Sequence, residues 1–178
     1  TVRALLERDI EATHRVAATA LEALEFPFDA GADVFIEVVE TVVVHLRLPP
    51  IDDVVPGTFG VVLKSGEIRE RFRPAEERNA DYRRLVLGLG ILVSSHLFAN
   101  LPRTDVVRVI ASVRRMKKRD SDPIDPCVFD LPVGRGSVEQ FRDGDLNLNR
   151  FAAMGMVLDC DSKGLLKAIP TPSCLEGI

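Results

Sequence analysis

The spacing of apolar side chains changes period several times along this chain, and this change constrains the fold more than any other feature. Residues 2–24 carry apolar side chains three and four positions apart, which is the spacing of one helical face. Residues 33–48 instead alternate apolar and polar side chains, as strands do, with a short reversal at Val39-Glu40. The β-branched content of this stretch favours strands over a buried helix. We therefore predict a helix followed by a hairpin.

The middle of the chain repeats the same two periods. Alternating runs at 58–64 and 67–73 surround a Ser-Gly pair, where glycine suits a tight turn, and they predict a second hairpin. Helical spacing returns between Pro74 and Pro102, where proline suits the first turn of a helix and cannot continue its end. We predict that this long helix, the most hydrophobic element of the chain, lies across the inner face of a sheet.

Patterns in the last third of the chain are shorter. Residues 106–113 and 127–133 alternate and predict a third hairpin with a long polar tip. Weaker patterns predict a strand at 138–141 and short helices at 148–153 and 162–169.

Hairpins with helices between them predict an α+β fold. We expect a mostly antiparallel sheet of five to seven strands, packed against an N-terminal helix and a long central helix. The length of 178 residues suits one domain, which we place at 1–169, with a loosely ordered tail at 170–178.

Composition narrows the functional classes. The apolar stretches fall far short of the roughly 20 residues needed to cross a bilayer, so we predict no membrane span. The formal net charge of −4 argues against binding nucleic acid by bulk charge, although it is compatible with binding through a local basic patch. Cys127, Cys160 and Cys174 are an odd number without metal-ligand spacing, so we predict no disulfide framework and no zinc site. These features favour a reducing, cytoplasmic setting.

No group of reactive side chains has a recognisable catalytic spacing. We predict a core or half-buried position for His96, surface positions for His14 and His45, and a buried Cys127 thiol on one face with Phe129 and Leu131. The sequence contains no nucleophile elbow and no phosphate-binding glycine loop at a strand-to-helix turn. We therefore name no catalytic residue and no cofactor, and the balance favours a protein that is not an enzyme.

Carboxylates on the predicted strands leave one enzymatic alternative open. A helix, a hairpin sheet and a second helix are similar to the core of PD-(D/E)xK nucleases, in which acidic residues and a lysine hold Mg²⁺ and a water. The residues available for such a metal site are Glu37 or Glu40 together with Glu67. Arg69 stands where that chemistry uses a lysine, so we predict at most a degenerate, metal-dependent phosphodiesterase.

A basic run at 114–119 is the candidate nucleic-acid-binding segment. Three arginines on the second predicted hairpin could add a second row if the two strands are neighbours. Asp120, Asp122 and Asp125 follow the run and oppose this interpretation, since they partly neutralise it. The candidate residues are Arg114, Arg115, Lys117, Lys118, Arg119, Arg69, Arg71 and Arg73.

Several short segments resemble a poorly characterised bacterial α+β domain that occurs in uncharacterised and restriction-endonuclease-like proteins. The resemblance rests on V-V-V-H-L-R-L-P at 42–49, the helix ending at 95–98, the valine-rich strand at 106–113, Cys127-Val128-Phe129, Arg150-Phe151 and G-L-L-K-A at 164–168. It implies a bacterial, intracellular protein with an accessory or binding role, and it assigns no catalytic residue.

Three functions follow as expectations. The first is a non-catalytic binding or interaction module, with nucleic acid or a protein as its partner. The second is the metal-dependent phosphodiesterase. The third is a structural homo-oligomerisation domain that uses Phe35 and Val43 on the outer face of the sheet.

Overall fold

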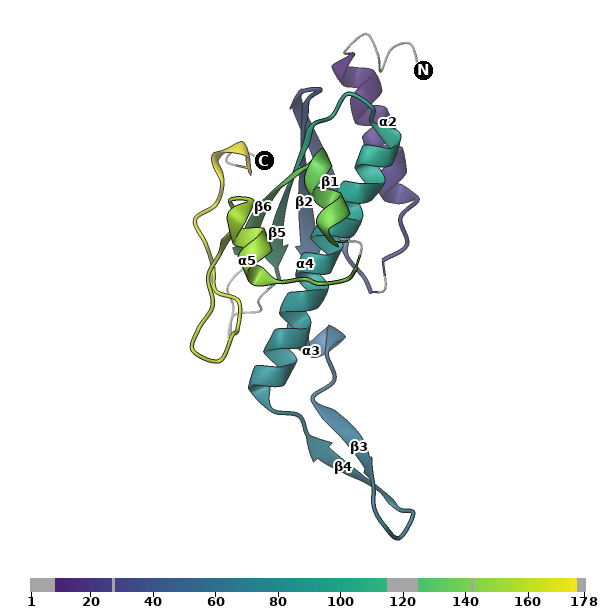
Figure 1. The fold of residues 1–178 in the computed structure, drawn as a ribbon, viewed down its shortest axis with the longest axis vertical. Helices are drawn as coiled ribbons and strands as arrows, with labels where there is room; N and C mark the ends of the chain where they lie inside the picture. Colours follow the sequence, from purple (N-terminus) through teal and green to yellow (C-terminus); the bar gives the residue numbers. More distant parts are fainter. Residues whose placement is uncertain (1–8, 27, 115–124, 142, 176–178) are drawn as a thin grey trace, which may run out of the picture.

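A five-stranded sheet forms the centre of the molecule, in the order β1-β2-β5-β6-β7 (Figure 1). The computed structural model describes residues 9–26, 28–114, 125–141 and 143–175. The strands span Gly31–Val38 (β1), Thr41–Leu48 (β2), Val106–Val113 (β5), Cys127–Gly134 (β6) and Val157–Leu158 (β7). Only β2 and β5 run parallel, while every other neighbouring pair in this sheet is antiparallel. The predicted α+β fold with a mostly antiparallel sheet is confirmed.

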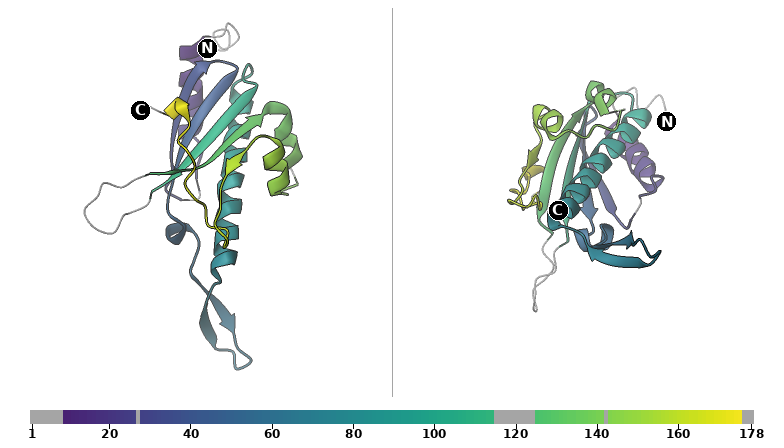
Figure 2. Two further views of the ribbon diagram at one scale, coloured as in Figure 1. Left: turned by 90° about the vertical axis from the view of Figure 1, so that its left-hand side faces the viewer. Right: turned by 60° about the horizontal axis from the view of Figure 1, so that its bottom comes forward.

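Two long helices cover one face of this sheet and enclose the main core (Figure 2). Helix α2 spans Ile10–Glu22 and begins where the carboxylate of Asp9 accepts a hydrogen bond from the Ala12 amide at 3.0 Å. Helix α4 spans Ala75–Asn100, as its spacing predicts. Gly90 lets α4 approach the sheet closely, since a Cβ atom there would lie 3.1 Å from Leu131 Cδ2.

The outer face of the sheet is covered only in part, by the segment that follows β7. The Ile169 amide donates a hydrogen bond to the Cys127 carbonyl at 2.8 Å, and Ile169 packs on Ile110 and Cys127 in a second, small core. A short 3₁₀ turn, η2, lies at Ser173–Leu175. The last described part of the chain therefore crosses the sheet on the face opposite α4 (Figure 2).

Strands β3 (Thr58–Val62) and β4 (Ile68–Phe72) form a separate two-stranded sheet. A short helix, α3, at Ile51–Val54 links β2 to this hairpin. Figure 1 shows the hairpin extending beyond the N-terminal end of α4, away from the main sheet. We call residues 57–73 the arm.

Two predictions of local secondary structure are wrong. Residues 138–141 belong to a 3₁₀ helix, η1 (Arg135–Phe141), and not to a strand. Residues 162–169 form a turn and a bridge between Cys160 and Leu166, because Gly164 adopts a φ of 76° that ends any helix there. By contrast, the short helix α5 at Leu148–Ala153 is confirmed.

A β-bulge corrects the predicted face of Cys127. The register between β5 and β6 shifts between Ala111 and Ser112, so that Ser112 lies opposite Cys127 while Ala111 lies opposite Phe129. Cys127 is buried, as predicted, but it packs in the small outer core and not with Phe129 and Leu131.

Candidate functional site

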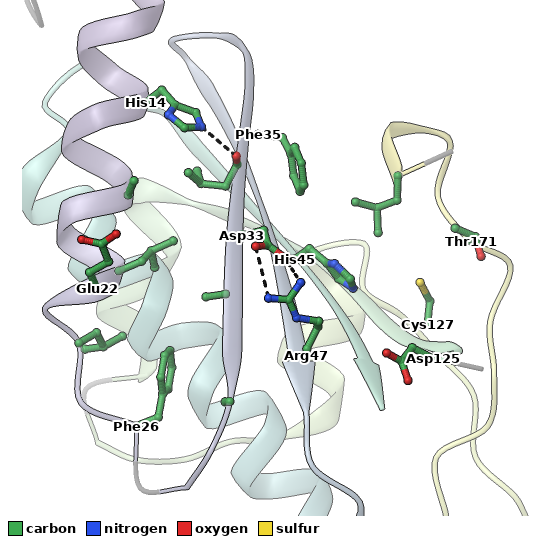
Figure 3. Close-up of a pocket in the computed structure, with 17 residues that line it drawn as sticks. His14, Glu22, Phe26, Asp33, Phe35, His45, Arg47, Asp125, Cys127 and Thr171 are labelled. Atoms are coloured by element: carbon green, nitrogen blue, oxygen red, sulfur yellow. Dashed lines mark hydrogen bonds and ion pairs between the residues drawn. The ribbon is translucent and has the colours of Figure 1, made fainter. Parts of the chain in front are cut away.

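An open cavity of about 910 Å³ wraps around β1 at the edge of the main sheet (Figure 3). Residues of α2 line it on one side of the strand, and residues of β2, β6 and the C-terminal segment line it on the other. The strand alternation places Asp33 on the outer face, where it lies opposite His45 of β2. The polar side chains that line the cavity are those of His14, Glu22, Asp33, His45, Arg47, Asp125, Cys127 and Thr171.

Two pairs of polar side chains on the outer face bond to each other. The Arg47 guanidinium donates to both carboxylate oxygens of Asp33, at 2.5 and 3.4 Å. His45 Nε2 lies 2.9 Å from the hydroxyl oxygen of Ser112 on β5. Ser112 is only 1% exposed and does not line the cavity, so this pair joins two strands beneath the surface. A nucleophile at Ser112 would be out of reach of a ligand in the cavity.

Burial shifts the pKa of both His45 and Cys127, and the shift at Cys127 does not favour nucleophilic catalysis. Burial is the largest influence on the His45 ring and lowers its pKa, against smaller opposing effects of nearby carboxylates. Burial likewise raises the pKa of the Cys127 thiol, which keeps it protonated. Among the residues that the structure describes, no three His, Cys, Asp or Glu side chains gather closely enough to hold a metal ion.

The predicted histidine positions are met in two of three cases. His14 is exposed, and its Nε2 lies 3.2 Å from the Val34 carbonyl oxygen. His96 is half-buried on α4. His45 was expected on the surface, yet it is half-buried and bonded to Ser112, because the parallel pairing of β2 with β5 sets the two strands side by side. The interval of 67 positions between these residues carries no sequence signal of that contact.

The structure does not bring the three candidate metal-binding glutamates together. Glu37 and Glu40 lie at the turn between β1 and β2, at one end of the main sheet. Glu67 lies in the arm, at the opposite end of the molecule (Figure 1). The phosphodiesterase alternative needs these carboxylates around one ion, so their placement argues against it.

The two candidate arginine rows lie on different sheets. Arg69 and Arg71 project from β4 in the arm, whereas Arg114 directly follows β5 of the main sheet. Arg73, at the base of the arm, forms an ion pair with Asp81 of α4. The remaining candidates, Arg115, Lys117, Lys118 and Arg119, lie outside the described residues.

The outer-face residues proposed as an oligomer interface are less open than expected. Phe35 is half-buried and lines the cavity. Val43 is half-buried as well and packs on the small core formed by Ile110, Cys127 and Ile169. The C-terminal segment contributes Ile169 to that core, so it occupies part of the surface on which a second copy was expected to sit.

The arm is fastened to α4 at its base. The Arg73 amide donates to the Gly57 carbonyl at 2.8 Å, which closes the hairpin, and the Arg73 side chain pairs with Asp81. Arg78 of α4 donates to the Val55 carbonyl at 3.0 Å and to the Asp52 carboxylate at 2.7 Å. These contacts hold the start of the arm against the first turns of the helix.

Beyond its base, the arm exposes apolar side chains to solvent. Phe72 is 89% exposed, Ile68 75%, Val62 69% and Phe59 45%. The alternating pattern of β4 does not place Ile68 and Phe72 against the main core, because the arm does not join the main sheet. Within the described part of the chain, β3 and β4 make extensive contact only with each other. Four of the exposed large hydrophobic side chains among the described residues therefore lie together in the arm.

Comparisons of the chain with protein-family models, with curated proteins and with solved structures found no match. The resemblance to a restriction-endonuclease-like α+β domain stays a prediction. Within the described residues, no helix has the length and apolar character needed to cross a membrane.

Proposed function

We propose that the protein is a non-catalytic interaction module that binds a protein partner through the arm. The observation that carries this proposal is the exposure of Val62, Ile68 and Phe72 on a hairpin that, among the described residues, makes no extensive contact with another element beyond its base. A two-stranded hairpin is only marginally stable in water by itself. Exposed apolar clusters on soluble domains usually mark contact surfaces. A partner that covers the arm would supply the burial that the chain does not provide.

Two further observations support the non-catalytic part of the proposal. Three of the polar side chains that line the cavity are held in internal pairs, Asp33 with Arg47 and His45 with the buried Ser112. The Cys127 thiol is held in its protonated form by burial. We keep the cytoplasmic setting as part of the same proposal.

Site-specific photo-crosslinking tests this function in cells that produce the protein. A photoreactive amino acid replaces Val62 in the arm and, as a matched control, Val157 on the short edge strand β7, which is 50% exposed. We expect light-dependent protein adducts from position 62 and none from position 157, with the crosslinked partner identified by mass spectrometry. Failure of position 62 to yield any protein adduct would overturn the proposal.

A second candidate function, nucleic-acid contact, is favoured by the other face of the arm. Arg69 and Arg71 lie opposite Val61 and Phe59, so two exposed guanidinium groups share a face with an exposed aromatic ring. If this face binds single-stranded nucleic acid, R69A/R71A should lower the magnitude of the slope of log affinity against log salt by about 1.4, since two phosphate contacts are lost. An unchanged affinity in that variant removes the candidate.

A further inference from the structure

The two free edges of the arm differ in charge. Strand β3 reads Thr-Phe-Gly-Val-Val and holds no charged residue, whereas β4 carries Arg69, Glu70 and Arg71 in its centre. In the described part of the chain, β3 pairs with β4 on one side and with no strand on the other. An uncharged, apolar strand edge is a template for another strand, and charged residues are the usual protection against such pairing. The β3 edge lacks this protection.

The backbone of β3 is oriented for pairing at that edge. The Leu63 amide bonds to the Glu67 carbonyl at 2.8 Å, and the Arg73 amide bonds to the Gly57 carbonyl at 2.8 Å. Because hydrogen-bonding residues alternate along an antiparallel ladder, the odd-numbered positions of β3 face β4. The amides and carbonyls of Thr58, Gly60 and Val62 therefore point toward the free edge.

From this geometry we infer that the partner of the arm is a second copy of the chain, paired antiparallel along β3 about a twofold axis at Gly60. This inference rests on the proposed function, since it names the partner of the arm and places the contact at the β3 edge, with Val62 in the pairing and Ile68 and Phe72 outside it. Gly60 would face its own copy, and Thr58 would face Val62 of the other copy. Each of these pairs uses outward-pointing backbone groups and can exchange both of its hydrogen bonds. A glycine within a strand is typical of a place where another backbone approaches closely.

The pairing also gives the exposed side chains of β3 new neighbours. On one face, Val62 would lie between Ile68 of its own chain and Thr58 of the other copy, because Val62 is already opposite Ile68. On the other face, Phe59 would lie opposite Val61 of the other copy. The two-stranded hairpins would become one four-stranded sheet with closed twofold symmetry, which needs no further copies.

Other arrangements of two arms are less favourable. Antiparallel pairing of β4 with its copy about Glu70 would set Glu70 against Glu70 and Arg69 against Arg71, and like charges directly opposite destabilise a sheet. Stacking the arms through the face that bears Ile68 and Phe72 would bury Glu70, because it lies between them on that face. Only the β3 edge pairs with itself without burying or opposing charges.

A charge swap on β3 tests the inference by light scattering over a range of chain concentrations. We expect the wild-type chain to approach twice its monomer mass of 19.6 kDa as the concentration rises. T58K/V62K places two Lys–Lys pairs across the axis, and T58E/V62E places two Glu–Glu pairs there. Each variant alone should dissociate roughly 25-fold more readily, at about fivefold per opposed pair, and an equal mixture should form a heterodimer.

I68K/F72K is the matched control, since it adds two lysines to the same face of the arm but on β4. It should remain dimeric, and unchanged circular dichroism and thermal midpoints should show that every variant is folded. Dimers that persist in T58K/V62K but disappear in I68K/F72K would overturn pairing along β3. A wild-type chain that stays monomeric at every concentration would overturn the second copy as partner. In that case adducts from position 62 to another protein would still support the proposed function.

Discussion

Replacing Arg78 with methionine should loosen the base of the arm far more than replacing its ion-pair partner Asp52 with asparagine. The Arg78 side chain is 20% exposed and that of Asp52 is 78% exposed, so solvent screening limits the ion pair to about 0.5 kcal/mol. The hydrogen bond from the guanidinium to the Val55 carbonyl joins a charged donor to a buried residue and contributes about 2 kcal/mol. The Arg78 Nε is buried and has no hydrogen-bond partner in the described chain. Replacing arginine with methionine removes the desolvation cost of this atom, which reduces the loss of stability by about 1 kcal/mol. The net loss is about 1.5 kcal/mol for R78M and about 0.5 kcal/mol for D52N.

Amide hydrogen exchange measures this difference at the arm itself. The Val55 amide bonds to the Ile51 carbonyl and the Arg73 amide to the Gly57 carbonyl, so both amides report opening of the base. Since 1.4 kcal/mol is a factor of ten, R78M should speed their exchange roughly tenfold and D52N about twofold. Amides in the centre of β5 should not change in either variant. Equal acceleration by D52N and R78M would show that the ion pair, and not the carbonyl contact, holds the base.

Two predictions concern the rest of the fold. Burial lowers the pKa of His45, so as the pH falls the unfolded chain takes up this proton before the folded chain does, and the free energy of unfolding decreases on the acid side. H45Q should show a shallower decrease between pH 7 and pH 5 in urea denaturation, and an unchanged slope would contradict this origin. G90V should lower the free energy of unfolding by about 2 kcal/mol, because a Cβ atom alone already lies 3.1 Å from Leu131 Cδ2. Wild-type stability in this variant would show that α4 can move away from the sheet.

Sequence periodicity is reliable here where a segment buries one continuous face. The helix at Ala75–Asn100 and the hairpin of β1 and β2 form as predicted, since both patterns depend on neighbours close in the chain. The pattern at 138–141 failed because only four positions support it, too few to distinguish a short strand from the 3₁₀ turn that follows β6. Candidate residues were harder to place, since a site depends on which elements become neighbours.

The order of helices and strands, and with it the α+β class, follows from the sequence alone, because each period of two or 3.6 residues is a local property of the chain. The uncharged character of β3 and the charged character of β4 can also be read there. Only the tertiary structure decides that β2 pairs in parallel with β5, which brings His45 to Ser112. It also decides that β3 and β4 stay outside the main sheet, where the alternation of Ile68 and Phe72 with arginines faces water on both sides. An alternating pattern specifies a strand but not its neighbour, and the proposed function of this protein depends on that choice of neighbour.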